Sequence, residues 1–147
     1  MRIRLHTLQL RYALALSAAL AGCATPPEQA SWPGWPEQSQ RKAVASLMDQ
    51  ARMEKSAGRL GNAAASMERA IRLAPRDPHL WQELARLRLN QRDYVQAEHV
   101  AMRSNTLSRG DYAIRAENWN IIAQAREGRG DTAGARTARA LAKRVEY

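Results

Sequence analysis

Histidine and acidic side chains, which carry most acid–base catalysis, do not converge on a recognisable arrangement in this sequence. His79 stands close to Asp77, but an aspartate at an expected helix start is explained as a cap for backbone N–H groups. Asp49 and Glu54 share one expected helix and Glu37 falls in an expected linker, so no acid–base pair forms. The sequence also has no glycine-rich phosphate-binding loop. We therefore predict that the protein is not an enzyme and uses no cofactor or small-molecule substrate.

The N-terminal segment has the properties of an export signal. Residues 1–11 contain three arginines and no acid, and residues 12–21 are apolar and uncharged. The apolar run is shorter than the ~20 residues that a helix needs to span a bilayer. A basic start followed by a short apolar stretch and small residues is typical of a secretory signal peptide.

Cys23 follows this segment in a pattern associated with lipid attachment. Leu20-Ala21-Gly22-Cys23 resembles the bacterial lipobox, in which the cysteine is acylated and becomes the first residue of the mature protein. The alternative is a buried structural cysteine near an N-terminal helix. The resemblance implies that residues 1–22 are a lipoprotein signal peptide. It also implies that Ala24, which is not aspartate, directs the lipid-anchored protein to the periplasmic face of the outer membrane.

The charge and the single cysteine limit the classes of partner. The formal net charge is +9, and loss of the three arginines of the signal peptide lowers it to +6. A basic balance suits nucleic acid, an anionic membrane or an acidic protein, and export argues against nucleic acid. One cysteine cannot form an intrachain disulfide, and with so few histidines it cannot build a metal cluster. We therefore predict no metal site.

Residues 23–40 are predicted to be the lipid anchor and an extended linker. Four prolines in this segment remove backbone donors and block helix formation. Trp32 and Trp35 are unusual in a solvated linker, and they either lie on the first helices or contact a partner.

From residue 41 onward, apolar and small residues recur with the helical period and indicate three pairs of helices. Leu47 precedes Trp81 by 34 residues, which is the tetratricopeptide period. The next hairpin repeats Trp81, Leu84, Ala85 and Ala97 as Trp119, Ile122, Ala123 and Ala135. The pattern resembles the tetratricopeptide family. It implies an all-α fold for residues 41–147, a short α-solenoid of three helical hairpins, with Trp81 and Trp119 in equivalent core positions.

Two features depart from the family's pattern. Trp119 follows Trp81 by 38 residues, so we predict that its helix begins early, near Asp111. The position at which the family places a large aromatic residue in the first helix of each hairpin holds Glu54, Arg88 and Arg126.

In this family the first helix of each hairpin lines a concave groove that binds a partner. By the repeat alignment, the groove of this chain is predicted to consist of Met48, Arg52, Lys55, His79, Gln82, Arg86, Asn90, Asn120 and Gln124. These residues include no acid, and arginine binds carboxylates through its planar fork. We therefore predict that the groove prefers an acidic or C-terminal peptide segment, the alternative being a solvated helix face.

The overall plan resembles the LpoP-type lipoproteins, small tetratricopeptide proteins that activate class A penicillin-binding peptidoglycan synthases. The residues that carry this resemblance include Gly58-Arg59-Leu60, Arg103-Ser104-Asn105 and Trp119-Asn120-Ile121-Ile122-Ala123. The resemblance implies a protein-binding module whose partner is a class A penicillin-binding protein. A pilotin-like lipoprotein that assists secretin or pilus assembly would have the same architecture. A cell-wall hydrolase is a further alternative, but the sequence lacks the acid pair that it needs.

Overall fold

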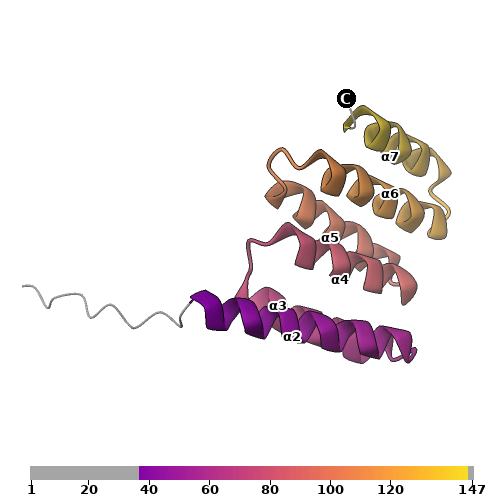
Figure 1. The fold of residues 1–147 in the computed structure, drawn as a ribbon. Coiled ribbons are helices and arrows are strands. Elements are labelled where there is room, and N and C mark those ends of the chain that lie inside the picture. Colours follow the sequence, from indigo (N-terminus) through magenta and orange to yellow (C-terminus); the bar gives the residue numbers. More distant parts are fainter. Residues whose placement is uncertain (1–36, 146–147) are drawn as a thin grey trace, which may run out of the picture. The chain divides into compact units, whose positions relative to one another are not determined.

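The computed structural model describes residues 37–145, which form six α-helices (Figure 1). Consecutive helices pair as three hairpins: α2 (Glu37–Ser56) with α3 (Leu60–Leu73), α4 (Pro78–Asn90) with α5 (Tyr94–Leu107), and α6 (Tyr112–Gly128) with α7 (Thr132–Val145). The predicted all-α fold of three helical hairpins is confirmed. Helix α2 begins at Glu37, so the last four residues assigned to the linker are helical.

The predicted signal peptide, Cys23 and the tryptophans of the linker lie outside the described residues. Among the helices that the structure describes, none combines the length and the apolar composition that crossing a membrane requires.

Aspartates set the starts of the later helices. Asp77 accepts a hydrogen bond from the backbone N–H of His79 at 2.9 Å, and Pro78 occupies the first helical position. Asp93 caps α5 in the same way, and Asp111 accepts from the backbone of Ile114 at 3.0 Å. A side-chain acceptor at this position satisfies one of the free N–H groups of the first turn. The cap at Asp77 and the early start of α6 after Asp111 agree with the sequence predictions.

The three turns inside the hairpins are equivalent in backbone geometry. Gly58, Arg92 and Gly130 have positive φ angles of 75°, 62° and 82°. In each turn the following residue donates its N–H to the carbonyl five positions earlier, as from Asp93 to Arg88 at 2.9 Å. This pair of features is a Schellman motif, in which glycine is favoured because it has no Cβ. The middle hairpin places an arginine where its two neighbours place glycine.

Arg92→Gly is expected to stabilise the fold by about 0.5–1 kcal/mol, because glycine adopts a positive φ without the clash of Cβ. Urea denaturation of the two proteins measures the difference. Arg109→Gly is the matched control: Arg109 is also an exposed arginine beside a turn, but its φ is not positive. Glycine there only adds freedom to the unfolded chain and should lower the stability. A loss of stability in both variants would contradict the strain assigned to Arg92.

The core consists largely of small residues between helices that pack closely. One cluster joins α2, α3 and α4 around Ala63, Met67, Ala70, Leu80 and Leu84. A second joins the later helices around Ala85, Ala101, Ile121, Ile122 and Ala138. Alanine allows two helices to approach closely, and leucine and isoleucine fill the spaces between hairpins.

The two repeated tryptophans lie at the rim of this core. Trp81 packs against the first cluster and Trp119 against the second, so their positions are equivalent, but both remain half-buried. Trp81 donates a hydrogen bond from Nε1 to the carbonyl of Pro75 at 2.9 Å, and the guanidinium of Arg103 lies 5.7 Å from its ring centroid. The prediction of core positions is therefore corrected in one respect, because both tryptophans are half-buried and lie at the rim of the core.

Ion pairs occupy two of the positions at which the family has aromatic residues. Arg88 of α4 pairs with Glu68 of α3, and Arg126 of α6 pairs with Glu98 of α5 at 2.7 Å. Glu98 also pairs with Arg129. Each pair joins the second helix of one hairpin to the first helix of the next. Charged contacts thus replace aromatic packing between neighbouring hairpins.

Glu54, the third of these residues, is bound within its own hairpin. It accepts hydrogen bonds from Arg59 and, at 3.4 Å, from Asn62. The bond from Arg59 lowers the pKa of Glu54. A carboxylate with a lowered folded pKa adds stability at neutral pH, and this contribution is lost as the pH falls through that pKa.

Candidate functional site

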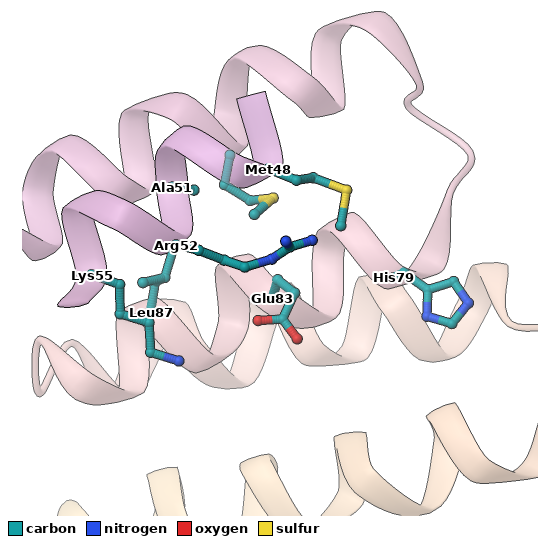
Figure 2. A pocket seen from close by; sticks show the side chains of 8 residues that line it. Met48, Ala51, Arg52, Lys55, His79, Glu83 and Leu87 are labelled. Atoms are coloured by element: carbon teal, nitrogen blue, oxygen red, sulfur yellow. The ribbon is translucent and has the colours of Figure 1, made fainter. Parts of the chain in front are cut away.

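Four of the predicted groove residues meet in an open hollow of about 420 Å³ between α2 and α4, named here the α2–α4 hollow (Figure 2). Its lining residues are Met48, Ala51, Arg52, Lys55, Met67, His79, Glu83 and Leu87. On α2 the lining residues recur every three or four positions, and on α4 every four, so each helix presents one face to the hollow. The structure thus brings Met48, Arg52, Lys55 and His79 together around one hollow.

The hollow has an apolar floor and a charged rim. Ala51, Met67 and Leu87 are buried and form the floor. The side chain of Arg52 is 70% exposed and pairs with Asp49 on its own helix at 2.7 Å. Lys55 is exposed and has no ion-pair partner among residues 37–145. Figure 2 shows Arg52 and Glu83 extending from the two helices into the same hollow. Such a surface can accommodate an apolar side chain on the floor and charged groups at the rim.

Gln82 does not belong to the groove, which corrects the prediction. Its side chain is 6% exposed and donates from Nε2 to the backbone oxygen of Ile114 and to Oδ1 of Asn118, both at 3.1 Å. Asn118 in turn donates to the hydroxyl of Ser104 at 2.8 Å, and this hydroxyl donates to the carbonyl of Pro78. We call Gln82, Asn118 and Ser104 the buried polar network. It joins α4, α5 and α6.

The expectation of an acid-free groove is also wrong. Arg86 lies between two acids: it pairs with Glu83 on its own helix and with Glu117 of α6 at 3.1 Å. Its side chain is only 33% exposed. Its charge is therefore largely neutralised by the protein itself. Arg52 and Lys55 remain as the predicted cations with the most accessible charge.

The other predicted residues lie further along the repeat array. Asn120 lines a second open hollow of about 400 Å³ with Tyr112, Ala113, Ala116 and Glu117. Asn90 and Gln124 are exposed and line neither this hollow nor the α2–α4 hollow. The nine predicted residues therefore do not form one continuous site.

Sequence reasoning missed Glu83 and Leu87, which are the main contributions of α4 to the hollow besides His79. They follow His79 by four and eight residues, so helical periodicity alone would have placed them on its face. The repeat alignment instead selected Gln82 and Arg86, one position away on the helix.

A solved structure, the globular C-terminal domain of P. aeruginosa LpoP, is 46% identical to this chain and matches it with a TM-score of 0.67. The match covers 69% of this chain and 95% of that structure. No protein-family model and no curated protein matches the chain.

Two more distant structures share the fold. The N-terminal domain of stress-induced protein-1 from C. elegans matches with a TM-score of 0.64, covering 74% of this chain and 95% of that one. The second tetratricopeptide domain of Spaghetti, solved with the HSP90 peptide SRMEEVD, matches with a TM-score of 0.62 and covers 74% and 98%. Both are 16% identical to this chain, which supports the tetratricopeptide architecture alone.

Proposed function

Since the chain belongs to the LpoP family of tetratricopeptide-repeat proteins, we propose that it is a lipid-anchored periplasmic module that binds and activates a class A penicillin-binding protein. The observation that carries this proposal is the 46% identity to the P. aeruginosa LpoP domain over 95% of that structure. LpoP-type lipoproteins are activators of these peptidoglycan synthases, so the proposal assigns the same role here.

Protein binding agrees with the chemistry of the described surface. The α2–α4 hollow is open, its charged groups stand at the rim, and an apolar floor lies between them. Two more distant structures share the fold, and one of them is a tetratricopeptide domain that was solved with a bound peptide. We assign no catalytic role to any residue of this chain.

The lipobox-like Leu20-Ala21-Gly22-Cys23 supports the anchor in this proposal. Acylated Cys23 would hold the protein at the periplasmic face of the outer membrane. The partner must then reach the repeat domain from the other side of the cell wall, or the linker must extend toward it.

The α2–α4 hollow is proposed as the partner-binding surface, with Arg52 and Lys55 facing an acidic segment of the synthase. The double variant Arg52→Glu with Lys55→Glu places like charges opposite that segment, which costs several kcal/mol across an interface. We expect the Kd for the purified synthase to rise at least about thirtyfold. Titration calorimetry measures the Kd, and a glycan polymerisation assay measures the loss of stimulation.

The matched control is Arg72→Glu with Arg136→Glu, which makes the same change of net charge on α3 and α7. Both residues are exposed and neither lines the α2–α4 hollow. The control should bind and stimulate the synthase as the parent does. Normal stimulation by the Arg52/Lys55 variant would show that the partner uses another surface, whereas failure of the parent protein to bind any class A synthase would reject the function itself.

A further inference from the structure

The positive charges of this domain are distributed unevenly between its two edges. The tether-side edge is the edge of the domain at which α2 begins, α3 passes to α4, α5 passes to α6 and α7 ends. Six exposed cations lie close to this edge and have no ion-pair partner among residues 37–145: Lys42, Arg72, Arg76, Arg109, Lys143 and Arg144. We call them the tether-side cations. Figure 1 shows that the start of α2, both of these loops and the end of α7 lie along the same edge.

Three acids of the described residues lie at this edge and offset its positive charge only in part. Glu37 pairs with Arg41 at 3.9 Å, and Asp77 and Asp111 direct their carboxylates at the first turns of α4 and α6 as caps. Around the opposite edge, where the hairpin turns lie, most arginines are paired. Arg59 pairs with Glu54, and Arg126 and Arg129 share Glu98. Lys55 and Arg92 are exceptions near the hairpin turns, so the edge with the tether-side cations carries more unpaired positive charge than the opposite edge, but not all of it.

The chain enters the domain at this edge, through the segment that follows Cys23. Thirteen residues separate Cys23 from Glu37, where α2 begins. Fully extended, they span at most about 45 Å. Because the chain enters the domain at this edge, an anchor at Cys23 would let the tether-side cations reach the membrane within the span of the linker.

The spread of these cations along the edge fits an extended anionic surface, and none of them lines the open hollow of about 410 Å³ between the start of α2 and the α3–α4 loop. They project from separate helix ends and loops, and none of them lines the hollows described above. An inserted peptide would instead need a floor and walls. Each Lys or Arg close to an anionic membrane raises the affinity by about fivefold, and the effect decays within a Debye length.

We propose that the tether-side cations dock on anionic phospholipid headgroups of the anchoring membrane, an inference that rests on the lipid anchor of the proposed function. Docking would hold the tether-side edge at the membrane and orient the opposite edge, with the three hairpin turns, toward the cell wall. The contact can be weak in isolation, because the anchor already confines the domain to the membrane surface.

The test uses the mature chain from residue 23 with Cys23→Ser, so that no acyl chain contributes to binding. It is mixed at low salt with vesicles that contain phosphatidylglycerol or with vesicles of phosphatidylcholine alone, and the sedimented fraction is measured. We expect binding to the anionic vesicles only, and weaker binding as salt is added. Arg76→Glu with Arg109→Glu should weaken this binding by at least about 25-fold.

The matched control is Arg92→Glu with Arg136→Glu, an equal change of charge at exposed residues away from the tether-side edge. Its affinity should stay within about threefold of the parent, since a single charge close to the membrane accounts for about fivefold. Circular dichroism checks that each variant is folded, and Lys42→Glu with Arg144→Glu replaces the first pair if it is not.

Equal losses in the two pairs would overturn the proposal, because they would mean that net charge alone drives binding. It would also be overturned by equal binding to both kinds of vesicle, by no binding, or by stronger binding to isolated peptidoglycan than to anionic vesicles. None of these results depends on lipidation or on the synthase, so they leave the proposed function open to its own test.

Discussion

Replacing Asn118 with alanine should lower the free energy of unfolding by about 2–4 kcal/mol. The side chain is fully buried and donates to Ser104 at 2.8 Å and to Asn105 at 3.0 Å while accepting from Gln82. The substitution removes all three hydrogen bonds and leaves a small cavity among α4, α5 and α6. For a domain of this size, this loss should lower the melting temperature by about 8–16 °C. The effect is large, because the total free energy of unfolding of such a domain is only about 5–15 kcal/mol.

Asn120→Ala is the control for this experiment. Asn120 is the same residue type on the same helix, two positions later, but it is only half-buried and lines an open hollow. Its loss should change the free energy of unfolding by less than about 0.5 kcal/mol. Thermal melts followed by circular dichroism compare both variants with the parent. Equal melting temperatures for the two variants would show that the buried polar network does not hold the second and third hairpins together.

Cys23→Ala should abolish membrane attachment of the full chain in cells. If the lipobox-like motif is processed as proposed, Cys23 is the only site of acylation, and each buried acyl methylene contributes about 0.8 kcal/mol to anchoring. We expect an unprocessed or soluble form that lacks the acyl mass. Fractionation of the envelope and mass spectrometry of the intact protein measure the two effects.

Ala24→Asp is the companion variant, because it keeps the cysteine and changes only the residue that the lipoprotein resemblance links to sorting. It should carry the same acyl mass as the parent but leave the outer-membrane fraction. A Cys23→Ala protein that still carried lipid and still fractionated with the outer membrane would rule out the lipobox interpretation.

The fold was predictable because its determinants are local. Aspartates before the expected helices and the glycine after α2 each act within one or two turns of helix. The 34-residue spacing from Leu47 to Trp81 relates different hairpins, but it is visible in the sequence as a repeat period. Even the extra residues before Trp119 were correctly interpreted, because Asp111 supplies a cap at the place where α6 begins. Periodicity and capping are properties that a single sequence displays directly.

The candidate site was less predictable because its polar residues depend on distant partners. Gln82 is buried by hydrogen bonds to Ile114 and Asn118, which are 32 and 36 residues away. Arg86 is neutralised in part by Glu117 of another hairpin. Nothing local distinguishes these side chains from those that stay accessible, such as Lys55. A polar residue on the expected inner face of a helix can either contact a binding partner or form hydrogen bonds with the neighbouring repeat.

The buried polar network also makes the two junctions of the repeat array unequal. The buried side chains of the network connect the second hairpin to the third. Among the helices that the structure describes, the first hairpin is joined to the second by one side-chain hydrogen bond, between the half-exposed Arg88 and Glu68. In a linear array, stability is the sum of repeat and junction terms. The later hairpins should therefore unfold as one cooperative block, while α2 and α3 can open in smaller fluctuations. The α2–α4 hollow lies at the weaker junction, so its width can adjust to a ligand without breaking a buried hydrogen bond.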